Sequence, residues 1–203
     1  MLIKKISGFV IALLFAGSAS ATVISVVPES TQVYLGDLVT VNVMISDFDA
    51  DTALGGYDLE LYYDASILSV TKFSFDDPVL GDQLDLQGYG SWSERSIYSS
   101  PMGDLIEFFK LSLDHADVLL SQQADEFALA SIEFRATNLG YSNLDIMVRG
   151  LIDQNGSDIS ADLMNSGINV IEVPSPAVAA LLLAGFPLLW MRKRVSLNTN
   201  TPA

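Results

Sequence analysis

Closely spaced carboxylates form one candidate ligand site, because oxygen clusters of this kind suit Ca²⁺. Asp47, Asp49 and Asp51 occupy alternate positions, and Asp58 falls at the twelfth place of an EF-hand count that starts at Asp47. Thr52, however, stands where the sixth-position glycine of such a loop would permit the sharp turn. We therefore expect a solvated acidic loop, with calcium as the weaker alternative and no other cofactor.

A second acidic stretch has the same two interpretations. Asp153, Asn155 and Asp158 surround an Asn-Gly pair, and oxygens at these positions could also bind Ca²⁺. A tight turn at Asn155 and Gly156 explains the stretch without a metal. The sequence commits to no metal site at either place.

Aromatic residues beside glycines form a candidate contact surface for a ligand. Tyr89 and Trp92 lie in the segment Gly-Tyr-Gly-Ser-Trp, and Tyr98 follows shortly after. Flat rings in such a loop could stack on sugar rings or anchor a protein partner. The alternative is that the loop folds its rings into the edge of the domain, which is the commoner outcome.

Catalytic chemistry has little support in the sequence. His115 is the only histidine, and the Ser and Asp residues around it could in principle form a Ser-His-Asp arrangement. No nucleophile-elbow motif accompanies it, so we expect a histidine in a surface turn. There is no cysteine, which excludes thiol catalysis, thiolate metal sites and disulfides. We expect a protein that is not an enzyme.

The charge of the chain excludes one class of partner. The chain has 25 acidic and 10 basic residues, and five of the basic residues lie near the two ends, at Lys4, Lys5 and 192–194. The segment 22–173 therefore keeps five basic residues against all 25 acidic ones. Such a surface repels phosphates, so nucleic-acid binding is excluded, whereas cations or a basic partner are favoured.

Alternation of apolar and polar residues predicts the elements that must position these candidates. Apolar residues recur with a period of two in the stretches 38–45, 57–64, 130–136 and 144–148. This is the pattern of strands with one buried face. The turn signals between them are Leu35-Gly36-Asp37, Gly55-Gly56, Asn138-Leu139-Gly140 and Asn155-Gly156. The sequence thus predicts an all-β sandwich or jelly roll, with one short helical turn between Ser121 and Glu126.

The N-terminal segment has the order of a secretory signal peptide. Two lysines precede an apolar run from Ile6 to Ala16, which is too short for a membrane span. Ala19 and Ala21 provide the small-residue site that signal peptidase accepts, so cleavage is expected after Ala21. We therefore assign residues 1–21 to a removable signal helix and the fold to residues 22–172.

The C-terminal segment is a second membrane-seeking sequence. An apolar run at 177–191 is followed by Arg192, Lys193 and Arg194 and then by a polar tail at 195–203. Basic residues remain on the cytoplasmic side, so the run predicts a short transmembrane helix in the inner membrane with its C-terminus inside. The preceding domain would then lie outside.

Residues 173–194 resemble the PEP-CTERM sorting signal of bacterial exported proteins. Pro174 and Pro176, the Ala- and Leu-rich run and the basic cluster match that pattern, whereas Ser175 stands where the family usually has glutamate. The resemblance implies recognition and removal by a membrane-embedded exosortase, with delivery to the cell surface or to an exopolysaccharide-rich extracellular matrix. The departure at Ser175 bears on how efficiently the tail is processed.

The stretches 41–70 and 127–153 resemble the early and late strands of cohesin-like domains. The resemblance rests on apolar positions and turns, including Ala53-Leu54-Gly55-Gly56-Tyr57 and Phe127-Ala128-Leu129-Ala130. It implies a nine-stranded, single jelly-roll sandwich related to carbohydrate-binding modules, in which one sheet face binds a partner; cohesins of the family bind dockerins.

Together these patterns lead to one expected function and two alternatives. We expect an exported surface or matrix module for binding or adhesion, which recognises a surface protein or an extracellular polysaccharide. The first alternative is a carbohydrate-binding module of a polysaccharide-associated system, in which Tyr89, Trp92 or Tyr98 stacks on sugar. The second is a structural, calcium-binding matrix protein.

Overall fold

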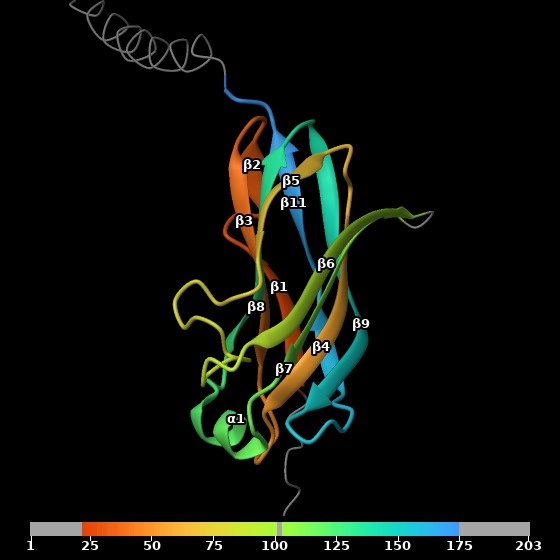
Figure 1. Ribbon diagram of the computed structural model, residues 1–203. Coiled ribbons are helices and arrows are strands. Elements are labelled where there is room, and N and C mark those ends of the chain that lie inside the picture. Colours follow the sequence, from red (N-terminus) through yellow and green to blue (C-terminus); the bar gives the residue numbers. More distant parts are fainter. Residues whose placement is uncertain (1–21, 101–102, 175–203) are drawn as a thin grey trace, which may run out of the picture.

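Two packed β-sheets make up the part of the chain that the computed structural model describes, residues 22–100 and 103–174 (Figure 1). The six-stranded sheet has the order β2 (Gln32–Tyr34), β11 (Ser166–Ile171), β9 (Gly140–Asp153), β4 (Leu54–Tyr63), β7 (Gly103–Ser112) and β6 (Ser91–Ser100). The five-stranded sheet has the order β10 (Ala161–Met164), β1 (Thr22–Pro28), β3 (Leu38–Ser46), β8 (Phe127–Ala136) and β5 (Leu68–Ser74). The all-β sandwich predicted from the sequence is confirmed.

The predicted alternation explains where the chain is buried. In β3 the side chains of Val39, Val41, Val43 and Ile45 are buried, and those between them lie nearer the surface. The same alternation buries Tyr57, Leu59, Leu61 and Tyr63 in β4. Each strand thus contributes one apolar face to the space between the sheets, which is how a sandwich of two packed sheets forms its core.

Aromatic rings and one buried hydroxyl connect the two layers. The ring of Tyr63 in β4 packs on that of Phe134 in β8, with centroids 5.3 Å apart. The hydroxyl of Tyr57 donates a hydrogen bond of 2.7 Å to the carbonyl of Leu129 in β8. Because its hydroxyl group is buried, the pKa of Tyr57 lies well above its ordinary value. Strand β4 is therefore fixed against the opposite sheet at two points.

The helix begins earlier than the sequence predicts. It spans Ala116–Gln122 (α1), whereas a turn between Ser121 and Glu126 was expected. Val118 and Leu119 are buried, so apolar contact draws the helix toward the sheet. The side chain of Gln123 bonds both the amide and the carbonyl of Leu54, at 2.6 and 3.0 Å, and so takes the chain out of the helix there.

Two details of the strands also differ from expectation. The described residues form eleven strands instead of nine, and β2 and β10, with three and four residues, are the shortest. Gly55 and Gly56 form no turn but lie inside β4, where the register against β9 shifts. A Cβ at Gly55 would lie 2.2 Å from the carbonyl oxygen of Asp153, so the strands approach here more closely than a side chain permits.

The two ends of the described chain lie at opposite ends of the sandwich (Figure 1). Thr22 pairs with Ala161 near the end where β3 finishes, and Ile171 pairs with Tyr34 at the other end. Within the described residues, no helix has the length and apolar character needed to cross a membrane. The predicted signal peptide, transmembrane helix and sorting residues from Ser175 onward lie outside these residues.

Candidate functional site

The outer face of the six-stranded sheet is the candidate functional site. Because Tyr57, Leu59 and Tyr63 of β4 point into the core, the intervening side chains point outward. Figure 1 shows α1 at one end of the sandwich, and on the outer face Trp92, Tyr98 and Met147 are exposed. This face brings together residues from four strands, β9, β4, β7 and β6.

Strand register places the outward side chains in rows across the sheet, since directly paired residues point to the same side. One row holds Asp145, Tyr62, Leu105 and Tyr98, and the next holds Met147, Glu60, Glu107 and Ser96. A third row holds Asp58, Phe109 and Glu94. Four carboxylates, those of Asp58, Glu60, Glu94 and Glu107, therefore lie in two adjacent rows with tyrosines on one side and Trp92 on the other.

One arginine reaches this acidic group because of a β-bulge. The register between β4 and β9 shifts between Asp58 and Leu59, which leaves Arg149 as the extra residue of β9. Its guanidinium lies 2.6 Å from a carboxylate oxygen of Glu60, 3.8 Å from Asp58 and 3.7 Å from Glu107. A single positive charge thus faces several carboxylates, and the surface keeps a net negative charge.

The two nearest carboxylates differ in their affinity for protons. The pKa of Glu60 is lowered from its ordinary value because its carboxylate accepts hydrogen bonds from Arg149 and from the hydroxyl of Tyr62. The pKa of Asp58 is raised, first by desolvation and then by Glu107 and Glu60, and Arg149 only partly offsets this. One oxygen of Asp58 is buried without a hydrogen-bond partner in the described chain. Asp58 is therefore the carboxylate that a cationic partner would stabilise most.

Substitutions at these two positions are expected to have opposite effects on stability at pH 7. Glu60→Gln should lower the free energy of unfolding by about 1 kcal/mol, since it weakens a charge-assisted bond to a half-exposed arginine. Asp58→Asn should leave it unchanged or raise it by up to about 0.5 kcal/mol, because an unfavourable charge on a partly buried side chain disappears. Urea unfolding of the full-length chain measures both values.

At acidic pH the stability lost through Glu60→Gln should disappear, and Asp58→Asn should still cause no large loss. The contribution of ionised Glu60 is present above its ordinary pKa of 4.5 and is lost as the pH falls through its lowered folded-state pKa. For Asp58 the raised pKa stabilises the folded state only below about its ordinary 3.8, and this contribution is lost as the pH rises through the folded-state pKa. Equal losses of stability in both variants at pH 7 would contradict the assignment.

A small apolar hollow lies beside the carboxylates. Gly56 of β4 and Gly150 of β9 lack side chains on the outer face, and Phe109, Leu111 and Ile152 surround the space they leave, about 90 Å³. The surface exposed in the hollow is apolar. Trp92, paired with Leu111 and packed edge-on against Phe109 at 5.8 Å, adds a large ring next to it. An apolar side chain of a partner could fill this hollow.

A buried lysine fixes the loop that leads into β6. Lys110 of β7 is 2% exposed, and its ammonium group lies 2.8 Å from Asp76 and 2.7 Å from Asp82, both in the loop after β5. Asp77 of the same loop accepts a bond of 2.7 Å from the amide of Ala128 in β8. These contacts attach the loop to both sheets and so position the start of β6, where Trp92 stands.

The three predicted aromatic residues do not form one loop surface. Trp92 and Tyr98 lie on β6 with their side chains on the outer face, 64% and 48% exposed. Tyr89 is in the preceding loop, 62% exposed, and its ring contacts that of His115 edge-on at 6.4 Å. The rings are therefore not folded into the edge of the sandwich, and whether they contact a ligand stays a prediction.

The acidic loops and the histidine have ordinary structural roles. One carboxylate oxygen of Asp153 accepts bonds from the amides of Asn155 and Ser157, and Gly156 has a φ of 80°, so the predicted tight turn is confirmed. Across the residues described, no group of three or more His, Cys, Asp or Glu side chains is placed to hold a metal ion. His115 is exposed at the N-cap of α1, and Asp114 beside it bonds the amide of Leu86.

Sequence reasoning missed most of the face itself. Glu94, Glu107, Phe109 and Arg149 come from three strands, and only their register places them together. The period-two alternation marked Asp58 and Glu60 as outward-facing, but it could not show which strands lie beside β4. No local signal in the sequence marks the bulge at Arg149.

Comparison with known proteins identifies the fold. No protein-family model and no curated protein matches the sequence. A type II cohesin domain from the cellulosome of Acetivibrio cellulolyticus aligns with a TM-score of 0.57 and 17% identity, covering 73% of this chain and 95% of that one. A non-cellulosomal cohesin from the archaeon Archaeoglobus fulgidus gives 0.55 and 16%, covering 75% and 93%.

A third structure, a cohesin in a type I cohesin-dockerin complex from Clostridium thermocellum, gives a TM-score of 0.54 and 13% identity, covering 73% of this chain and 99% of that one. Identities this low establish similarity of fold, not of partner. The described chain is a β-sandwich with the fold of cohesin domains.

Proposed function

We propose that this protein is a non-catalytic binding module that docks a protein partner on the outer face of its six-stranded sheet. The observation that carries the proposal is the apolar hollow at Gly56 and Gly150, which lies beside the row of carboxylates around Asp58. Interfaces are commonly built from a desolvated apolar anchor with a polar surround. A partner with one apolar side chain for the hollow and a nearby Arg or Lys for the carboxylates would complement this face.

The comparisons support a binding role over a catalytic one. Cohesin structures with the same fold include complexes with dockerins, so a sandwich of this type can present a face to another protein. The hollow favours a protein ligand over a polysaccharide because the surface it exposes is apolar and suits an apolar side chain better than a sugar hydroxyl. The identity of the partner is not carried over from these relatives.

A photo-crosslinking amino acid at Trp92 tests the docking face in cells that display the full-length protein. Trp92 is 64% exposed on the proposed face, whereas Val27 is 45% exposed on the outer face of the other sheet and serves as the matched control position. We expect a protein adduct from position 92 and none from position 27. Mass spectrometry of the adduct would identify the partner.

A substitution in the hollow distinguishes specific docking on this face from non-specific contact with position 92. Gly150→Val should fill the hollow and reduce the adduct at position 92 by about five- to thirtyfold, since a lost hot-spot contact costs roughly 1–2 kcal/mol. Adducts of equal yield from both positions, or an adduct unaffected by Gly150→Val, would reject the proposal.

The site at which the module acts is also part of the proposal. We infer that the chain is exported through its signal peptide, anchored by the segment at 177–191 and sorted by an exosortase-type enzyme to the cell surface or matrix. The order of the terminal motifs supports this, together with the acidic surface expected of a soluble exposed domain.

Intact-mass measurement of the surface-exposed protein tests the sorting step. In a host with an exosortase, the mature species should lack residues 1–21 and the segment beyond about Pro174, and in the exosortase deletion it should keep the tail. Ser175→Glu should increase the cleaved fraction, because it restores the residue usual in the sorting motif. A tail retained in both hosts would make the protein a membrane-tethered module instead.

A further inference from the structure

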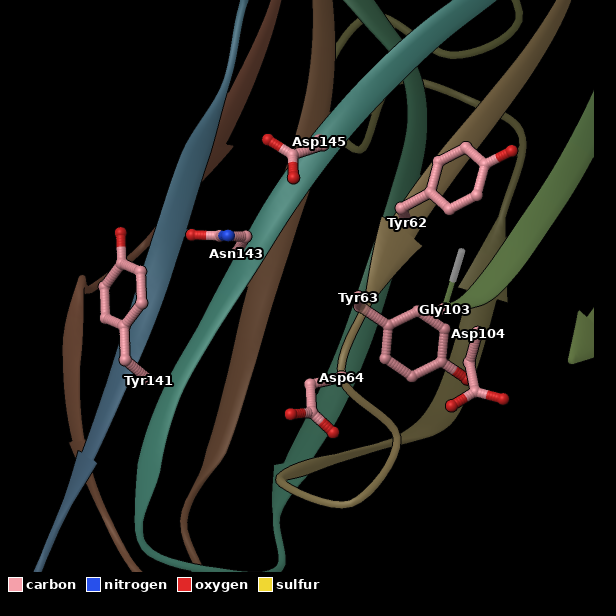
Figure 2. Close-up of a pocket in the computed structure, with 8 residues that line it drawn as sticks. All are labelled: Tyr62, Tyr63, Asp64, Gly103, Asp104, Tyr141, Asn143 and Asp145. Carbon is pink, nitrogen blue, oxygen red and sulfur yellow. The ribbon is translucent and has the colours of Figure 1, made fainter. Parts of the chain in front are cut away.

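A separate pocket lies at the far end of the same sheet, where β4 ends and β7 and β9 begin (Figure 2). Its volume is about 400 Å³, within the range of roughly 300–1,000 Å³ typical of small-molecule sites. Asp64, Asp104, Asp145 and Asn143 supply polar groups, and none of the described residues that line the pocket is basic. It is distinct from the apolar hollow at Gly150.

Tyr63 has a buried ring and a hydroxyl group at the wall of this pocket. Tyr63 is only 8% exposed, because its ring packs on Phe134 in the core. Figure 2 shows its hydroxyl turned toward Asp104. The pKa of Tyr63 is raised, first because the side chain is partly buried and second because of the negative charge of Asp104. Among the described residues this hydroxyl has no hydrogen-bond partner. The hydroxyl is not one of the described side-chain atoms that are both buried and unpaired, so it is accessible from the pocket that Tyr63 lines and can bond a ligand atom.

The carboxylates are placed for a ligand larger than a metal ion. Asp64 accepts hydrogen bonds from the amide and the hydroxyl of Ser66, and Asp104 accepts one of 2.6 Å from the hydroxyl of Ser99, so both are fixed in place. Figure 2 shows the three carboxylates spread around the pocket. Among the described residues, no set of three or more acidic, His or Cys side chains is placed to hold one metal ion. A ligand must therefore reach several separate acceptors.

A ligand that carries acceptors of its own would complement the pocket best. The phenol of Tyr63 and the side-chain amide of Asn143 can donate hydrogen bonds, whereas the carboxylates only accept them. Sugar hydroxyl groups do both, but a guanidinium or ammonium group only donates. Tyr62 and Tyr141 add ring surfaces, and the hydroxyl of Tyr62 is held by Glu60 at 2.8 Å, which fixes its ring for packing against sugar carbons.

We propose that this pocket binds one neutral hexose or N-acetylhexosamine unit of a saccharide. Asp145 and Asp104 accept hydrogen bonds from its hydroxyl groups, Tyr63 and Asn143 donate hydrogen bonds to its oxygens, and Tyr62 and Tyr141 contact its apolar carbons. The module would then have a saccharide site beside its protein-docking face. The saccharide site does not depend on the docking proposal.

Saturation-transfer NMR on the full-length protein tests the proposal, in a zwitterionic detergent without a sugar headgroup. The probes are the methyl glycosides of glucose, galactose, mannose, N-acetylglucosamine and N-acetylgalactosamine, each at 50 mM. At least one probe should receive saturation from the tyrosine rings. Tyr63→Phe, which keeps the ring and removes only the hydroxyl, should weaken binding about three- to tenfold, as the loss of one hydrogen bond predicts.

Controls distinguish this site from the rest of the face. Asp145→Asn and Asn143→Ala change exposed side chains and should also weaken binding, whereas Trp92→Ala, outside the pocket, should leave it unchanged. Acetyl-arginine amide at the same concentration is the competing probe. Absence of transfer to all five glycosides, transfer unaffected by Tyr63→Phe, or salt-sensitive binding of the arginine probe instead would overturn the proposal.

Discussion

Gly55→Ala is expected to lower the free energy of unfolding by about 3 kcal/mol, at the upper end of the cost of overpacking. The new Cβ would lie 2.2 Å from the carbonyl oxygen of Asp153 and 2.8 Å from its carbonyl carbon. Both are backbone atoms of β9, so no side chain can move to make room. The strands β4 and β9 would have to separate, and with them Asp58 and Arg149. Urea unfolding of the full-length protein measures the loss.

Gly150→Ala is the matched control on the same pair of strands. A Cβ at Gly150 would meet only the Cβ of Asp58, at 3.7 Å, which is an ordinary contact. Since alanine loses less backbone entropy than glycine on folding, this variant should be unchanged or more stable by up to about 1 kcal/mol. A similar loss in both variants would show that the close approach at Gly55 does not limit stability.

Lys110→Ala is expected to lower the free energy of unfolding by about 2–4 kcal/mol, from lost packing and lost charge pairing. The side chain of Lys110 is almost fully buried, its ammonium group contacts both Asp76 and Asp82, and it lies 6.0 Å from the ring centre of Phe75. Its removal should also release the loop after β5. Hydrogen exchange in the segment 75–90 should rise, together with the loss of stability.

Lys110→Met separates packing from charge, because methionine keeps most of the apolar stem. Asp76 and Asp82 have 50% and 25% of their side-chain surface exposed, so water can solvate them once the lysine is gone. The methionine variant should therefore lose less than half as much stability as the alanine variant. Equal losses would show that the ion pairs, not the packing, hold the loop.

Strand alternation was the most informative property of the sequence, and its limits are physical. Val39, Val41 and Val43 indicated a buried strand because one face of a strand must be apolar when two sheets pack. The helix was misplaced because Gln123, in the middle of the predicted turn, uses its side chain to bond Leu54, which is 69 residues away. Such a contact has no local signature in the sequence.

The candidate site was predictable only in part for the same reason. Trp92 and Tyr98 were selected for their chemistry, and both prove to be exposed on one face of β6. Their neighbours Glu107 and Phe109 lie on this face because β7 pairs with β6. Arg149 reaches it because of the β-bulge between β4 and β9. Tyr63 appeared from the alternation to be a core residue, and its ring is one, although its hydroxyl borders a pocket.

The position of the two chain ends determines how the sandwich carries a mechanical load. Thr22 and Ile171 lie at opposite ends of the strands, so a pull between them runs along β1 and β11. The hydrogen bonds that join β1 to β3 and β10 would then be sheared together rather than opened one after another. Resistance to force depends on the unfolding rate, which is low when many bonds must break at once. A tether at one end and a pull at the other would therefore load these strands in shear.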